Sequence, residues 1–249
     1  MKEDVLRKVF SKELLEKMKD ENPFRKLSEI VYEMTEDAII SCELHPGTQL
    51  NTVKISKLLD ISRTPVTDAL EQLLNTGLVT ASPEKRGYYV FDISYDFLEK
   101  LIEARRAIEN YASFMCAQRS GELDLRELRD LAAKFRDSVR NWDHREFARI
   151  DQLFHQKIIE NCGNELIKAM YKSILQISTY TSNRVEDYIE KYPPTSAMRG
   201  FENQHMAIYN AIALSLPDMA FAASDRHLDS ILILCLKGYK YMDEEIRID

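Results

Sequence analysis

The sequence predicts a mainly α-helical protein with two parts: an N-terminal domain of three helices and a β-hairpin, and an all-α antiparallel helical bundle. Three observations support this fold class. Only seven Gly and seven Pro occur among 249 residues, so helix formers dominate. Three short helical periods and then two short strand-like runs follow one another between residues 28 and 92. After Ser94 the apolar spacing is helical almost throughout, with short connections that favour antiparallel neighbours in one bundle.

The composition is typical of a globular protein and excludes a membrane-spanning one. Hydrophobic residues make up 45% of the chain and charged residues 30%. The longest apolar run, residues 231–236, is far shorter than the roughly 18 residues of a membrane span, and the N-terminus lacks the apolar stretch of a secretory signal. The four cysteines are widely spaced without a CxxC pair, which indicates reduced, mostly buried thiols. We therefore expect a cytoplasmic protein that does not enter a membrane.

Residues 1–27 are predicted to be a helical extension. Apolar residues recur four apart, as on one face of a single helix: Leu6, Phe10, Leu14 and Met18. The polar faces carry both signs of charge, which argues against a helix lying on a membrane. We expect the extension to pack against its own chain or against a dimer partner.

The elements of residues 28–92 follow the order of a winged helix-turn-helix domain. Helices are predicted over residues 28–41, 52–59 and 63–75, and strands over 78–81 and 88–91. Ser62 is a favourable N-cap for the third helix, Pro65 falls in its first turn, and Gly77 follows its end. Residues 93–249 would then form a second, all-helical domain.

The residues that would meet DNA lie at the start of the third helix and at the tip of the hairpin, because this helix enters the major groove. The candidates are Ser62, Arg63, Thr64, Thr67, Lys85, Arg86 and Gly87. Arg63 would donate two hydrogen bonds to a guanine, worth about 1–3 kcal/mol of discrimination. The charge balance opposes DNA binding, since residues 28–92 hold five basic and ten acidic side chains in a chain of net charge −7. We therefore expect modest, salt-sensitive affinity that depends on dimerisation.

The run PGTQL…ISKLLDISRTPVTDALEQLLNTGLV…RGYYV resembles the DNA-binding domain of the GntR family of bacterial regulators. The segment SRTPV, the following AL pair and the GLV after the helix carry the resemblance. It implies a winged helix-turn-helix that binds a double-stranded DNA operator as a homodimer. The family commonly has arginines where this chain has Val53 and Thr67, so we expect an operator that departs from the family's familiar one.

Three helices of the bundle are predicted to carry polar side chains inside apolar stripes. The bundle helices are expected over residues 95–119, 122–141, 143–162, 164–191, 194–215 and 218–240. Asp151 and His155 lie one turn apart in the third of these. His205 lies in the fifth and His227 in the sixth. A buried Asp or His is costly unless it is paired or bound to a metal, so the four side chains would suit a divalent ion with open positions for water or a ligand.

The alternative for each of these histidines is a purely structural role, as a hydrogen-bonded core residue. Three histidines on inward stripes, together with an acid one turn away, favour a metal site, with Zn, Mn or Ni as candidate ions. His45 and His144 belong to no such stripe, and we expect both at the surface.

Residues 95–240 resemble the FCD-type effector domain of the FadR branch of GntR regulators. The resemblance lies in EARRAIE at 103–109, DQLFHQKIIENCGN at 151–164, HMAIYNAI at 205–212 and RHL at 226–228. It implies that the metal ligands are Asp151, His155, His205 and His227, with zinc as the first candidate. It also implies that Arg105 faces the cavity and pairs with a carboxylate effector, the alternative being an exposed helix salt bridge. Gln204 replaces an acid common beside the third ligand and would change the bonding around the ligands without changing ligation.

Taken together, these features predict a transcriptional regulator whose operator binding responds to a small organic acid. Three alternatives stand beside it. A mononuclear metal hydrolase would need a general base near the metal, and none is evident, so we expect no enzymatic activity. A metal sensor would use the ion itself as its effector, and a purely structural site would affect stability alone.

Overall fold

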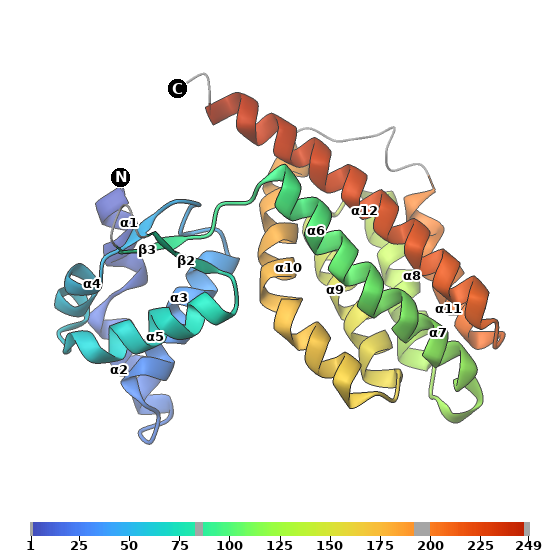
Figure 1. The fold of residues 1–249 in the computed structure, drawn as a ribbon, viewed down its shortest axis with the longest axis horizontal. Helices are drawn as coiled ribbons and strands as arrows, with labels where there is room; N and C mark the ends of the chain where they lie inside the picture. The colour runs from blue at the N-terminus through green and yellow to red at the C-terminus, as the bar shows by residue number, and fades with distance from the viewer. Residues whose placement is uncertain (1, 83–86, 192–199, 247–249) are drawn as a thin grey trace. The chain divides into compact units, whose positions relative to one another are not determined.

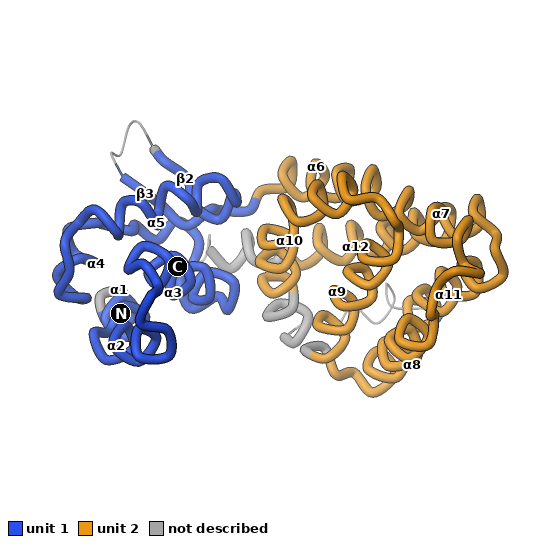
Figure 2. The backbone as a smooth tube through the Cα atoms, turned by 90° about the horizontal axis from the view of Figure 1, so that it is seen from below, with its two compact units in different colours: residues 1–93 blue, residues 94–249 orange. Residues whose placement is uncertain are grey.

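The structure is a computed structural model that describes residues 2–82, 87–191 and 200–246. The chain divides into two compact units, residues 1–93 and residues 94–249, which Figure 2 shows in blue and orange. Each unit buries its own hydrophobic core.

Unit 1 is a winged helix-turn-helix domain with a helical extension. Its helices are α1 (Lys2–Val9), α2 (Lys12–Glu21), α3 (Leu27–Ile40), α4 (Thr52–Leu59) and α5 (Arg63–Asn75). Its strands are β1 (Gln49–Leu50), β2 (Val79–Ser82) and β3 (Gly87–Val90), in the antiparallel order β1-β3-β2. Helices α3 and α4 both pack against α5. Three helices followed by the β2–β3 hairpin confirm the predicted fold of this part, while the two-residue strand β1 was too short to show a periodic pattern.

Local sequence signals set the helix-turn-helix formed by α4 and α5. The Asn51 side chain accepts a hydrogen bond of 3.0 Å from the backbone N–H of Lys54 and so caps α4. Asp60 ends α4 in the left-handed conformation, with a φ of 56°. Ser62 occupies the N-cap position of α5. Fully buried apolar side chains then join the three helices: Ile30, Ile39, Ile55, Leu59, Val66 and Leu70.

The N-terminal extension folds as two helices, so the prediction of one continuous apolar stripe is wrong. The Ser11 side chain accepts a hydrogen bond of 3.1 Å from the backbone N–H of Leu14 and starts a new helix. This break turns a different face of α2 inward, so that Leu14 is 38% exposed and Leu15 is buried instead. Both helices pack against α3, and α2 also contacts α4.

Unit 2 is an all-α bundle (Figure 1). Its elements are α6 (Tyr95–Arg105), the π-helical turn η1 (Arg106–Asn110), α7 (Tyr111–Gln118), the 3-10 turn η2 (Ser120–Glu122), α8 (Arg126–Asn141), α9 (His144–Asn161), α10 (Glu165–Lys191), the 3-10 turn η3 (Phe201–Asn203), α11 (Gln204–Ala213) and α12 (Pro217–Ile246). Helix α12 contacts α6, α7, α10 and α11, and α9 contacts both α8 and α10. The bundle confirms the predicted fold class of this part.

The helix expected over 122–141 begins at Arg126, the one expected over 218–240 extends to Ile246, and two further bundle helices differ in their course. The helix expected over residues 95–119 contains the π-helical turn Arg106–Asn110. The helix expected over 194–215 is the turn η3 followed by the short α11, because Gly200 takes the left-handed conformation with a φ of 81° just before them. Residues 192–199 of the expected helix lie outside the described residues.

Two expectations from the composition concern membranes and thiols. Among the described residues, no helix combines the length and the apolar character that a membrane crossing requires. All four cysteines are free thiols, and three of them are buried while Cys42 is partly exposed. The prediction that the thiols are mostly buried is confirmed.

Candidate metal centre

Four polar side chains from three helices meet in the core of unit 2. Asp151 and His155 lie one turn apart on α9, while His205 lies at the start of α11 and His227 on α12. All four are buried, the histidines with 1% exposure or less. Their potential ligand atoms lie within 4.8 Å of one another. The structure thus brings together the four residues that the sequence proposed as metal ligands.

The atoms that face one another are Oδ1 of Asp151 and the three Nε2 atoms. Oδ1 of Asp151 lies 3.1 Å from Nε2 of His205 and 3.1 Å from Nε2 of His227. It lies 3.7 Å from Nε2 of His155. The Nε2 atoms of His205 and His227 are 3.4 Å apart. Two ligands of one ion with bonds of about 2.1 Å are about 3.0 Å apart at right angles and about 3.4 Å apart at a tetrahedral angle, so this spacing suits one small cation.

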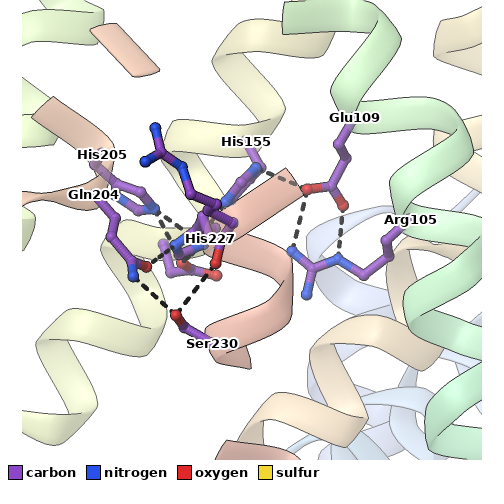
Figure 3. A network of polar contacts seen from close by, with 9 residues as sticks. Arg105, Glu109, His155, Gln204, His205, His227 and Ser230 are labelled. Atoms are coloured by element: carbon purple, nitrogen blue, oxygen red, sulfur yellow. Dashed lines mark hydrogen bonds and ion pairs between the residues drawn. The ribbon is translucent and has the colours of Figure 1, made fainter. Parts of the chain in front are cut away.

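His155 is bonded on its outer side to a buried carboxylate. Nδ1 of His155 lies 2.7 Å from Oε2 of Glu109, and both side chains are 1% exposed (Figure 3). Glu109 lies in the π-helical turn η1. Since a carboxylate only accepts hydrogen bonds, the proton of a neutral His155 ring is on Nδ1 and the lone pair is on Nε2.

His227 is bonded on its outer side to an amide. Nδ1 of His227 lies 3.0 Å from Oε1 of Gln204, whose Nε2 donates to Oγ of Ser230 at 2.8 Å (Figure 3). Ser230 Oγ in turn donates to the backbone oxygen of Arg226 at 3.2 Å, which leaves it to accept from Gln204 and so fixes the amide orientation. Gln204 adjoins His205 in sequence, but in space it bonds to His227.

These outer bonds determine where the inner lone pairs point. With their protons on Nδ1, His155 and His227 both direct an Nε2 lone pair toward the carboxylate of Asp151. Lone pairs and a carboxylate oxygen repel each other at such distances unless a cation lies between them. Nε2 of His155 has no hydrogen-bond partner among the described residues. The donor set therefore fits a metal ion.

His205 is held by aromatic stacking. Its ring is stacked on Phe154 at 4.1 Å between centroids and lies 3.8 Å from the ring of Phe135. Burial lowers the pKa of His205 to about 3 and also lowers the pKa of His227. A neutral imidazole is the protonation state that binds a metal.

Arg105 lies in the same core, in a two-point ion pair with Glu109. Nε donates to Oε1 at 2.6 Å and Nη2 donates to Oε2 at 3.2 Å. Burial would raise the pKa of Glu109, but Arg105 and then His155 outweigh it and lower the pKa to about 2. Because both partners are buried, this is not the exposed salt bridge considered as an alternative. Nη1 of Arg105 donates to no described residue, and the predicted role of Arg105 in effector binding stays a prediction.

A small cavity adjoins the cluster on the side of Asp151. Its volume is about 30 Å³, and apolar side chains of Phe147, Val185, Ile231 and Leu234 form most of its wall. This volume matches about one water molecule. The cavity therefore leaves room next to the cluster for a water or for one group of a ligand.

The residues proposed to contact DNA lie in unit 1. Ser62, Arg63 and Thr64 are exposed at the start of α5, and Thr67 is half-buried one turn later. Gly87 is the first residue of β3. Lys85 and Arg86 lie outside the described residues. Of the two histidines expected at the surface, His45 is exposed, while the side chain of His144 is not among those described.

Glu109 is the site residue that the sequence did not single out, although it ends the EARRAIE segment. A signal for it exists in the spacing of the buried residues Leu98, Leu101, Arg105, Glu109, Ala112 and Cys116. Arg105 and Glu109 interrupt this apolar stripe just as Asp151 and His155 interrupt theirs. A charged pair one turn apart on a buried face is costly unless its charges are matched, so the pattern indicates a role in the core.

Two family comparisons cover most of the chain. Residues 27–90 match the bacterial regulatory proteins of the gntR family, and residues 100–230, more than half of the chain, match the FCD domain. The HTH-type transcriptional repressor RspR of Escherichia coli (strain K12) is 25% identical over 210 residues, which are 84% of this chain and 89% of that protein. The HTH-type transcriptional regulator LutR of Bacillus subtilis (strain 168) is 27% identical over 213 residues, 79% of this chain and 95% of that protein.

Solved structures agree with the fold. A GntR transcriptional regulator from Rhodococcus sp. RHA1 superposes with a TM-score of 0.66 at 20% identity and covers 84% of this chain and 97% of its own. McbR/YncC of E. coli superposes with a TM-score of 0.65 at 16% identity and covers 87% of this chain and 100% of its own. The family and the relatives are regulators of transcription rather than enzymes. The chain therefore belongs to the GntR family of bacterial transcriptional regulators, in which an FCD domain follows the DNA-binding helix-turn-helix domain along the sequence.

Proposed function

We propose that a small carboxylate metabolite, bound at a divalent metal in unit 2, modulates how this regulator binds its DNA operator. The metal would be held by Asp151, His155, His205 and His227. The spacing of their four inner atoms and the inward lone pairs support this assignment. Zinc is the first choice for three imidazoles and one carboxylate, with nickel or manganese as the alternatives.

The charge balance of the core is the observation that carries the choice of a carboxylate. Among the described residues, the buried charged side chains are Arg105, Glu109 and Asp151, which together carry one net negative charge when the histidines are neutral. A divalent metal changes this balance to one net positive charge. An unbalanced charge in a buried site is costly, so a monoanion is the ligand that neutralises the loaded core.

The same core offers a second contact for such an anion. Two nitrogens of Arg105 are bonded to Glu109, while Nη1 donates to no described residue. Arg105 would direct this N–H toward the carboxylate of the effector, a charge-assisted hydrogen bond. The bound metal would supply Lewis-acid attraction for the ligand, and the chain's own residues would orient it.

On the DNA side, we propose a homodimer that presents two copies of α5 to a two-fold-related operator in the cytoplasm. Ser62, Arg63, Thr64 and Thr67 would contact the major groove, and Lys85, Arg86 and Gly87 would contact the DNA from the wing. The exposed first turn of α5 supports this arrangement. The effector can change operator binding only if it binds two arrangements of the dimer with different affinity.

Gel-shift titration of DNA from upstream of the chain's own gene tests the proposal. We expect specific, salt-sensitive binding that shifts when one member of a panel of small carboxylates is added to metal-loaded protein. The shift should disappear after chelation and return with zinc. Absence of specific binding on every upstream fragment would refute the DNA assignment. A response to metal alone, with no carboxylate effective, would make the protein a metal sensor.

A further inference from the structure

The Arg105–Glu109–His155 chain of contacts extends beyond the four proposed ligands. Both carboxylate oxygens of Glu109 are used: Oε1 accepts from Arg105 Nε at 2.6 Å, and Oε2 lies 2.7 Å from Nδ1 of His155 and 3.2 Å from Nη2 of Arg105. All three side chains are buried. Glu109 is therefore an ionised acceptor with a fixed direction, because Arg105 matches its charge and its plane.

Two other residues of the turn η1 bond through their side chains to helix α12. Asn110, the next residue of η1, donates from Nδ2 to Oδ1 of Asp225 on α12 at 2.9 Å. Arg106, at the start of η1, bonds to Asp229 on the same helix. The turn is thus tied to α12, which carries His227, while Glu109 reaches across to His155 on α9. A π-helical turn is rare and frequently occurs at functional sites.

The bond to Glu109 has a definite consequence for His155. An imidazole binds a metal through the nitrogen that carries no proton, and the hydrogen bond of the other nitrogen decides which one that is. Without an acceptor at Nδ1, the proton of His155 could occupy either nitrogen. With Glu109 in place, the proton is held on Nδ1, and Nε2, which lies 3.7 Å from Oδ1 of Asp151, presents its lone pair to the centre of the cluster.

We infer that Glu109 is a positioning residue of the metal centre, which fixes the tautomer and the ring orientation of His155 and so raises the affinity of the site for its ion. The inference rests on the proposed metal site. Carboxylate partners of metal-binding histidines contribute about 10–100-fold in metal affinity. Arg105 supports Glu109 by matching its charge, which keeps the carboxylate ionised in the core.

Competition with a chromophoric chelator at neutral pH, using Zn²⁺ and Ni²⁺ on the metal-stripped full chain, measures this contribution. Glu109→Met removes the acceptor at Nδ1 of His155 and should weaken binding of both ions by roughly 10–100-fold. Glu103→Met makes the same change at an exposed position of α6 and should leave the affinity unchanged. If Glu109→Met binds both ions within about threefold of the unchanged chain, the inference is refuted. If the unchanged chain itself binds neither ion, the proposed metal site fails and the inference fails with it.

A double variant distinguishes the positioning role of Glu109 from the effect of leaving the charge of Arg105 unpaired in the core. Glu109→Met leaves Arg105 buried without its partner, which destabilises the core. Arg105→Met with Glu109→Met removes both charges and keeps their sum, and it should show the same loss of metal affinity. Recovery of full affinity in the double variant would refute the role of Glu109.

The tautomer can be observed directly by NMR on protein with ¹⁵N-labelled histidine. In the metal-free chain, the signals of His155, assigned by their loss in His155→Gln, should show the proton on Nδ1. A merely structural Glu109 would not set this state. A proton on Nε2 of His155 would refute the inference.

Discussion

Oδ1 of Asp151 lies 3.1 Å from Nε2 of His227, and the proton of that histidine is held on the far side of the ring by Gln204. Two acceptors therefore face each other in the core. The same situation recurs at His155, whose proton is held by Glu109. A divalent cation between these atoms removes the repulsion, and several measurable consequences follow.

Substitution of His205 should separate metal binding from packing. His205→Phe keeps an aromatic ring between Phe154 and Phe135 but removes one of four ligand atoms. We expect metal affinity to fall by at least about 100-fold, a loss of about 2.8 kcal/mol or more on the scale of about 1.4 kcal/mol per tenfold. Chelator competition measures it, and His45→Phe, at an exposed histidine, is the matched control. Unchanged affinity in His205→Phe would contradict the ligand assignment.

Lowering the pH should begin to destabilise the metal-free protein above the pH range in which carboxyl groups take up protons. The pKa of His205 is about 3 in the folded chain and near 6.5 when unfolded, so the unfolded state takes up the proton first. The free energy of unfolding is thus fully present above pH of about 6.5 and falls as the pH drops toward 3, by up to about 1.4 kcal/mol per pH unit for this histidine. His227, whose pKa is also lowered, acts in the same direction.

Urea denaturation of chelator-treated protein between about pH 4.5 and 7 measures this slope. In this window the carboxyl group of Glu109, whose pKa is lowered, stays ionised in the folded chain. His205→Phe should reduce the slope, because one proton uptake is removed. A stability independent of pH in this range would contradict the buried, neutral state of His205.

Removal of Arg105 should weaken both the fold and the ligand response. Arg105→Gln leaves the buried carboxylate of Glu109 without its ion pair, and breaking a buried pair costs about 3–5 kcal/mol. We expect a lower free energy of unfolding in urea together with loss of the carboxylate response in gel shifts. Lys100→Gln breaks the exposed pair with Asp96 on the same helix and should change neither measurement. A full carboxylate response in Arg105→Gln would show that Arg105 does not bind the effector.

Substitution of Arg63 should reduce sequence-specific DNA binding. Arg63 is exposed at the first position of α5, where a guanidinium can reach a guanine. Arg63→Ala should cost about 1–3 kcal/mol of specific affinity in fluorescence anisotropy with a labelled operator. Arg63→Lys keeps the charge without the two-point geometry, so it should retain binding to random DNA and lose discrimination. Equal discrimination by Arg63→Lys and the unchanged chain would contradict base reading by Arg63.

The helices of unit 1 could be predicted closely because their boundaries are set locally. Asn51 caps α4 and Ser62 precedes α5, so the predicted ranges 52–59 and 63–75 agree with the structure. The break at Ser11 was also a local capping signal, but an apolar spacing of four residues across it concealed the break. Helix boundaries are thus predictable where the cap and the apolar period agree.

The metal ligands could be proposed from the sequence because each interrupts an apolar stripe of its own helix. The sequence could not show that the four ligands converge, or which residues bond to the outer nitrogens of the histidines. Both depend on contacts between distant segments. Nδ1 of His227 meets Gln204 across 23 positions, and the turn that holds Glu109 is tied to α12 by a bond between Asn110 and Asp225, 115 positions apart. No periodicity within one helix reveals such a bond.

Anomalous X-ray diffraction at the zinc edge, on crystals of the full chain purified without chelator and with zinc added, tests the metal centre most directly. We expect one strong peak among the side chains of Asp151, His155, His205 and His227, about 2.0–2.2 Å from Oδ1 and from the three Nε2 atoms. No anomalous peak among these four side chains, in crystals where they are well ordered, would contradict the assignment of this cluster as a metal centre.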